Sequence, residues 1–241
     1  MGGLRVERDG DVLRVTLARP ERRNAFDAQL IADLTAAFSD VGDARAVVLA
    51  GDGEAFCAGA DIEWQRSAID LTYDENVDDA IKLYRMCEAI DVCRAPVVAR
   101  IHGYALGGGS GLAACADIAI ASTDATFGFT EAKLGIIPAV ISPFVLPKIG
   151  QHARRYFLTG ERFDAATALR IGLVHEVTEE PDATVDAIVE QLLSSGPKAV
   201  RAAKELVRER PDGRRTAEIA ARMRTSEEGQ QRLRAFFERR K

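Results

Sequence analysis

The fold is decided by the stretch Pro96-Val97-Val98-Ala99-Arg100-Ile101-His102-Gly103-Tyr104-Ala105-Leu106-Gly107-Gly108-Gly109-Ser110-Gly111-Leu112-Ala113-Ala114-Cys115. Its apolar start predicts a buried strand, and its alanine-rich end predicts a buried helix. Three consecutive glycines separate the two. They allow another group to approach the backbone closely and leave the first N–H groups of the helix unpaired. Such donors, at the positive end of a helix dipole, can hold a developing negative charge.

A purely structural explanation of these glycines stays open, because glycine near a helix start is common and allows close packing on a strand. Three other motifs are excluded. The lysine of a phosphate-binding loop is absent, and Gly107, Gly109 and Gly111 do not give the dinucleotide pattern. Leu112 stands where a nucleophile elbow around Ser110 needs its second glycine. The remaining interpretation is a donor site without a nucleophile of its own.

Composition bounds the class of protein. The chain has 241 residues, of which 47% are hydrophobic, and a formal net charge of -5. This length suits one large domain, with or without a helical extension, and the negative charge does not favour nucleic acid or an anionic membrane. No apolar stretch approaches the roughly 18 residues of a membrane span, and the first residues resemble no signal peptide. The four cysteines form no C-x-x-C pair, and the histidines lack metal-ligand spacing. We therefore expect a cytoplasmic protein with reduced cysteines and no metal.

Along the chain, strand signals dominate the first half and helical signals the second. Asp9-Gly10 predicts a hairpin turn, and Asp27 and Asp61 are expected to cap helices. Strands are predicted at 12–17, 46–50, 96–101, 117–121 and 126–129, and helices at 27–38, 74–93, 143–149, 151–159, 164–170, 183–194, 197–209, 214–225 and 226–240. The pattern beyond Pro143 is helical almost without interruption. The sequence thus predicts an α/β core over residues 1–190 and a helical part over residues 191–241.

A second small-residue turn, at Gly59-Ala60, follows a predicted strand just as Gly107-Gly108 does. Loops at the same ends of neighbouring parallel strands meet in space, so two backbone N–H groups could form an oxyanion hole. With the motifs at 55–62, 103–117 and 127–138, the sequence resembles the crotonase (enoyl-CoA hydratase/isomerase) superfamily from about residue 4 onward. The resemblance implies a spiral of ββα units, a C-terminal trimerisation region and a homotrimer or hexamer (dimer of trimers). It also implies an acyl-coenzyme A substrate and no separate cofactor.

The resemblance implies roles for individual residues. The N–H groups of Ala60 and Gly108 would hold the thioester oxygen, and Glu131 would be the acid/base, although an ordinary surface glutamate near a helix start is the alternative. The residues implied to bind substrate or coenzyme A are Arg22, Ala25, Ala58, Ala60, Asp61, Ile62, Gly107, Gly108, Thr130, Glu131 and Pro138. The arginine-rich segment 226–240 is either a solvated docking face or a contact for a neighbour's coenzyme A phosphates.

The resemblance is incomplete at Gly111. Hydratases of the family commonly use two glutamates; Glu131 matches the second, and Gly111 replaces the first. Hydration of a 2-enoyl-CoA is the first choice, with a single-glutamate isomerase and a weakly catalytic acyl-CoA-binding protein as alternatives. The segments 107–112, 138–143 and 155–159 resemble methylglutaconyl-CoA hydratase-like members. We therefore expect the missing side chain at Gly111 to make room for a branched or carboxylated acyl group.

Overall fold

The computed structural model describes residues 2–239, so Arg240, at the end of the last predicted helix, lies outside the described residues. The chain divides into two compact units, Met1–Ala187 and Ile188–Lys241. The boundary between them lies inside α8 (Pro181–Ser194). Within the described part of the chain, no helix combines the length and the apolar character needed to cross a membrane.

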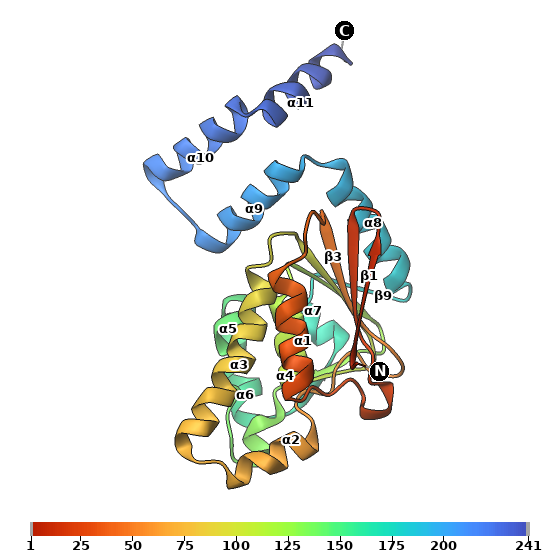
Figure 1. Cartoon of the computed structure of the whole chain (residues 1–241), viewed down its shortest axis with the longest axis vertical. Coiled ribbons are helices and arrows are strands. Elements are labelled where there is room, and N and C mark those ends of the chain that lie inside the picture. Colours follow the sequence, from red (N-terminus) through yellow and green to blue (C-terminus); the bar gives the residue numbers. More distant parts are fainter. Residues whose placement is uncertain (1, 240–241) are drawn as a thin grey trace. The chain divides into compact units, whose positions relative to one another are not determined.

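The first unit is built on a six-stranded sheet (Figure 1). Its strands, in spatial order, are β1 (Leu4–Asp9), β2 (Val12–Leu17), β3 (Ala46–Gly51), β4 (Val97–Ile101), β6 (Ile118–Ser122) and β9 (Glu176–Thr178). The predicted hairpin is confirmed, because β1 pairs antiparallel with β2 around Gly10, and the remaining pairs are parallel. A smaller sheet holds β5 (Tyr104–Leu106), β7 (Thr126–Gly128) and β8 (Arg162–Asp164). This is the predicted α/β class, with two small mixed sheets.

One face of the larger sheet carries the core. Val15, Leu49, Ala99 and Ala119 lie in one row across four neighbouring strands, and all four are fully buried. Because side chains alternate along a strand, this row and its repeats two residues away face the same side. Helices α1 and α3 pack against each other over this face (Figure 1). The helices of this unit are α1 (Ala28–Ser39), α2 (Ile62–Ser67), α3 (Tyr73–Asp91), α4 (Gly108–Cys115), α5 (Ser142–Ile149), α6 (Ala153–Thr159), α7 (Ala165–Ile171) and the start of α8.

Capping explains where several helices begin. The predicted caps are confirmed: the Asp27 carboxylate accepts the Leu30 N–H, and the Asp61 carboxylate accepts the Glu63 N–H. Helix α3 instead begins at a capping box formed by Thr72 and Glu75.

The helices predicted beyond residue 143 are confirmed, with ends that differ by a few residues, but the sequence did not predict the two strands that lie among them. Strands β8 and β9 lie in this region, and each has only three residues. So short a strand shows no period-two pattern, and its partners, β7 and β6, are remote in sequence.

The second unit is helical. It holds the end of α8 and the helices α9 (Pro197–Glu209), α10 (Gly213–Thr225) and α11 (Glu227–Glu238). The Glu228 carboxylate accepts the N–H groups of Lys198 and Ala199, both at 3.0 Å, and so ties α11 to the start of α9. A carboxylate at a helix N-terminus satisfies unpaired donors and favours the helix dipole. The trimerisation role of this region stays a prediction.

Candidate active site

Two loops meet at the carboxyl ends of the neighbouring strands β3 and β4. The Cys57 N–H donates to the Tyr104 carbonyl at 2.9 Å, and the Leu106 N–H donates to the Cys57 carbonyl at 3.0 Å. A Cβ atom placed on Gly59 would lie only 2.7 Å from the Leu106 carbonyl oxygen and 3.5 Å from the Gly108 nitrogen. The two predicted glycine turns are therefore in direct contact.

Each turn contributes a backbone N–H group that is not used by the fold. Phe26 bonds to the residues on either side of Ala60, through the Gly59 carbonyl and the Asp61 N–H, both at 2.9 Å. The Ala60 N–H therefore points away from Phe26. Gly108 is the first residue of α4, so its N–H has no carbonyl within the helix. Among residues 2–239, neither N–H has a hydrogen-bond partner. Both residues line the same pocket.

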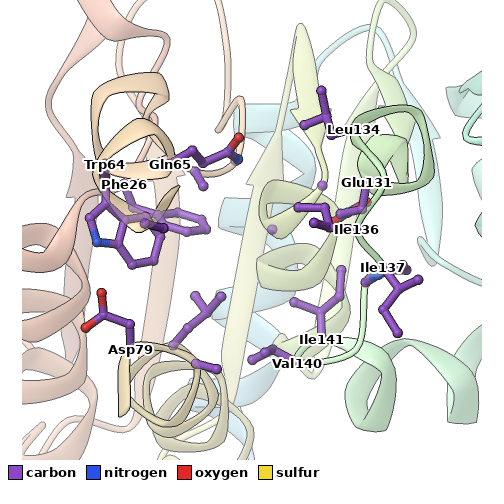
Figure 2. A pocket seen from close by; sticks show the side chains of 18 of the residues that line it. Phe26, Trp64, Gln65, Asp79, Glu131, Leu134, Ile136, Ile137, Val140 and Ile141 are labelled. Atoms are coloured by element: carbon purple, nitrogen blue, oxygen red, sulfur yellow. The ribbon is translucent and has the colours of Figure 1, made fainter. Parts of the chain in front are cut away.

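The pocket has a volume of about 260 Å³ and lies within the first unit (Figure 2). Most of its lining is apolar or backbone. It is formed by Phe26, Ala58, Gly59, Ala60, Trp64, Gln65, Ala68, Asn76, Asp79, Ala80, Leu83, Gly107, Gly108, Thr130, Glu131, Leu134, Ile136, Ile137, Pro138, Val140 and Ile141. A mainly apolar concavity with a few placed polar groups is typical of a small-molecule site.

Glu131 brings its carboxyl group to the glycine turn. It lies in the 3-10 helix η3 (Thr130–Leu134), directly after β7. Gly107 has a φ of +52°, and a Cβ atom there would lie 3.1 Å from Glu131 Oε1. The carboxyl group thus occupies the space beside a backbone that only glycine readily adopts.

The environment of Glu131 changes its acidity. Its Oε2 atom is buried and has no hydrogen-bond partner among the described residues. Burial raises the pKa of Glu131 above its ordinary value, because the charged form loses its hydration. A carboxyl group with a raised pKa, next to free backbone donors, is suited to exchange a proton with a bound substrate.

The pocket includes most of the residues that the resemblance implies. Ala58, Ala60, Gly107, Gly108, Thr130, Glu131 and Pro138 all line it. Arg22, Ala25, Asp61, Ile62 and Gly111 do not. Those predicted to contact coenzyme A outside the pocket stay predictions.

Asp61 has a structural role in addition to any contact with a ligand. Its buried carboxylate accepts hydrogen bonds from Arg22, at 2.7 Å, and from Arg19, at 3.3 Å. Burial by itself would raise the pKa of Asp61, but these bonds, the Glu63 N–H and the two positive charges lower it overall. The ionised carboxylate therefore joins the loop around Arg19 and Arg22 to the start of α2.

The expectation that Gly111 leaves room for an acyl group is wrong. A Cβ atom on Gly111 would lie 2.5 Å from Ile141 Cγ2 and 2.9 Å from Ile141 Cβ. Gly111 is buried in α4, and the Ile141 side chain, just before α5, fills the space opposite it. The pocket wall at this point is Ile141 itself. The glycine permits close packing of the wall and does not enlarge the pocket.

Sequence reasoning missed the wall opposite Glu131. Phe26, Trp64, Asp79 and Leu83 come from the region before α1 and from α2 and α3, where no motif marks them. The single tryptophan of the chain was one available signal. Figure 2 shows Phe26, Trp64 and Asp79 together on one side of the pocket and Glu131 on the other.

Comparison with known proteins agrees with this geometry. The family model "Enoyl-CoA hydratase/isomerase" matches residues 7–241. The chain is 32% identical to enoyl-CoA hydratase AKT6-1 of Alternaria alternata over 88% of this chain and 71% of that protein. Among solved structures it is similar to an enoyl-CoA hydratase from Shewanella pealeana, with a TM-score of 0.93, 37% identity and coverage of 98% of this chain and 94% of that one. It is also similar to Pseudomonas aeruginosa AtuE, with a TM-score of 0.92, 36% identity and coverage of 98% and 97%. The family model matches most of the sequence, and the fold and the two free N–H groups agree with it. This chain therefore belongs to the enoyl-CoA hydratase/isomerase family of the crotonase superfamily.

Proposed function

We propose that this protein is an enoyl-CoA hydratase that adds water across the double bond of a 2-enoyl-CoA. One observation carries the proposal: the unpartnered carboxyl group of Glu131 lies in the same pocket as the free N–H groups of Ala60 and Gly108. The relatives described as enoyl-CoA hydratases support the choice of reaction. No other carboxyl group lines the pocket beside the glycine turn among the described residues; Asp79 lies across from Glu131.

In this mechanism the thioester oxygen accepts hydrogen bonds from the N–H groups of Ala60 and Gly108. Glu131, as carboxylate, takes a proton from water while the water oxygen bonds to the β-carbon. The electron pair of the double bond moves to the thioester oxygen, which becomes enolate-like. The enolate then returns its electrons to the α-carbon, which receives the proton from Glu131. The hydrogen and hydroxyl of one water molecule are thus added, and Glu131 is a carboxylate again.

Two effects supply the acceleration. Removing one oxyanion donor typically costs roughly 10²–10³-fold in rate, and a positioned acid/base contributes roughly 10²–10⁴-fold. The raised pKa of Glu131 suits both halves of the cycle, since the same group must first accept and then release a proton.

A second candidate is a double-bond isomerase, and the Gly111–Ile141 contact favours it. Gly111 replaces the first of the two family glutamates, and the apolar side chain of Ile141 fills the space beside it. An isomerase needs only one base: Glu131 would take a proton from the α-carbon of a 3-enoyl-CoA and return it to the γ-carbon. Such an enzyme would not need to position water.

Purified protein would be assayed with crotonyl-CoA and with a 3-enoyl-CoA of six carbons. Hydration removes the conjugated-enoyl absorbance and adds the mass of one water, whereas isomerisation creates that absorbance without a change of mass. We expect hydration by the wild type and its loss in Glu131→Gln. The matched control is Glu63→Gln, the same substitution at an exposed carboxylate on α2 that does not line the pocket.

Isomerisation without hydration would replace the first candidate by the second. Binding of both thioesters without turnover would leave an acyl-CoA-binding protein and overturn both. Equal activity of Glu131→Gln and the wild type would overturn the assigned role of Glu131.

The family resemblance further supports a homotrimer or a dimer of trimers, with coenzyme A contacts from Arg22, Ala25, Asp61 and Ile62. Analytical ultracentrifugation tests the assembly, and a monomer at micromolar concentration would contradict it.

A further inference from the structure

The ionisable groups that line the pocket have one sign of charge. Among the described residues, Glu131 and Asp79 are the ionisable side chains of the lining, and it includes no lysine, arginine or histidine. The remaining polar side chains, Gln65, Asn76 and Thr130, are neutral. An anionic group that enters this pocket therefore meets no lining cation and two acidic residues.

Asp79 lies on α3 on the side of the pocket formed by Phe26 and Trp64, across from Glu131 (Figure 2). Its Oδ1 atom accepts a hydrogen bond from Lys82 Nζ at 2.8 Å. The Lys82 side chain is 60% exposed and that of Asp79 is 24% exposed. The lysine thus approaches Asp79 from the solvent side and does not itself line the pocket.

The neutral polar side chains near Asp79 offer few free hydrogen-bond donors to a carboxylate. The Asn76 side-chain nitrogen already donates to the backbone carbonyls of Leu71 and Thr72, at 3.1 and 3.0 Å. The facing wall is apolar and consists of Leu134, Ile136, Ile137, Val140 and Ile141. Moving a carboxylate from water into such surroundings is costly unless it is paired or well hydrogen-bonded.

From this lining we infer that the pocket selects uncharged acyl chains against chains that end in a carboxylate, and that Asp79 determines the selection. The inference rests on the proposed acyl-CoA site, and it names the substrate class of that site. A distal carboxylate would be repelled by the Asp79 carboxylate and would lose its hydration against the apolar wall. A branched hydrocarbon chain meets neither penalty.

The test compares two saturated thioesters that cannot be hydrated. Valeryl-CoA and glutaryl-CoA have acyl chains of equal length, and a terminal methyl group in the first is a carboxylate in the second. Their dissociation constants would be measured by calorimetry with the wild type, Asp79→Asn and Asp78→Asn. Asp78 is the matched control, because it is an exposed carboxylate on the same helix and does not line the pocket.

For the wild type we expect glutaryl-CoA to bind about tenfold more weakly than valeryl-CoA or worse. Asp79→Asn leaves Lys82 without its carboxylate partner, so the ratio of the two constants should fall about fivefold or more. Asp78→Asn should keep the wild-type ratio. Equal affinity for both thioesters in the wild type, or an unchanged ratio in Asp79→Asn, would overturn the inference.

A turnover measurement separates this inference from the proposed function. The ratio of kcat/KM for 2-pentenoyl-CoA and glutaconyl-CoA should change in Asp79→Asn in the same direction as the binding ratio. Selective binding without turnover would overturn only the hydratase proposal. Turnover with no discrimination between the two chains would overturn only the selection by Asp79.

Discussion

Replacing Gly111 with alanine should destabilise the protein, although the same change in most helices stabilises. Alanine in a helix interior is about 1 kcal/mol more favourable than glycine. Here the new methyl group would lie 2.5 Å from Ile141 Cγ2 and 2.9 Å from its Cβ. Overpacking of this kind costs about 1–3 kcal/mol, and contacts this short belong to the upper part of that range. The net loss in the free energy of unfolding should therefore be about 1–2 kcal/mol.

A double-mutant cycle with Ile141→Ala identifies the cause. That substitution alone should cost about 2 kcal/mol, at the lower end for a buried isoleucine, because Ile141 borders the pocket. It also removes the atom closest to the new methyl group, so the double variant should lose less than the sum of the single losses by about 0.5–3 kcal/mol. Urea unfolding, followed by circular dichroism and by the fluorescence of Trp64, measures each variant.

The control cycle pairs Gly111→Ala with Val140→Ala. Val140 also borders the pocket, but the three atoms closest to a Cβ on Gly111 all belong to Ile141. The losses in the free energy of unfolding caused by Gly111→Ala and Val140→Ala should therefore add to within about 0.5 kcal/mol. Additivity in the Ile141 cycle, or a Gly111→Ala variant as stable as the wild type, would refute the packing argument. The same contact means that a glutamate at position 111 must displace Ile141, so its effect would not measure room for substrate.

Two further predictions concern buried carboxyl groups. Burial raises the pKa of Glu131 above its ordinary value of 4.5. Between these two pKa values the folded state holds a proton that the unfolded state has released. The free energy of unfolding therefore falls as the pH rises through this range. Glu131→Gln should therefore gain stability relative to the wild type as the pH rises above about 4.5, as shown by urea midpoints measured over a pH series; a constant difference would contradict this. Asp61→Asn keeps a helix cap but loses the charge that Arg19 and Arg22 bind, and should cost about 2 kcal/mol in the same assay. A loss no larger than that of Glu63→Gln at the exposed neighbouring position would show that the ion pairs contribute nothing.

Local signals in the sequence were sufficient for much of the fold. Asp9-Gly10 supplies the positive φ of a hairpin turn, and Asp27 supplies the acceptor that a helix start requires. The apolar run at β3 predicts a strand covered on both faces, since only such burial removes four consecutive apolar side chains from water. The glycine turns and Glu131 were marked by their motifs, and the structure places all three in one pocket.

What the tertiary structure alone decided is which side chains face one another. Strands β8 and β9 exist because β7 and β6 offer them partners, and three residues carry no pattern of their own. Ile141 fills the space beside Gly111, and Asp79 lies across the pocket from Glu131, although nothing in the spacing of these residues relates them. A sequence motif records the backbone conformation and the chemistry of a few neighbouring residues. The shape and charge of a pocket arise from close packing between segments that are distant in the chain.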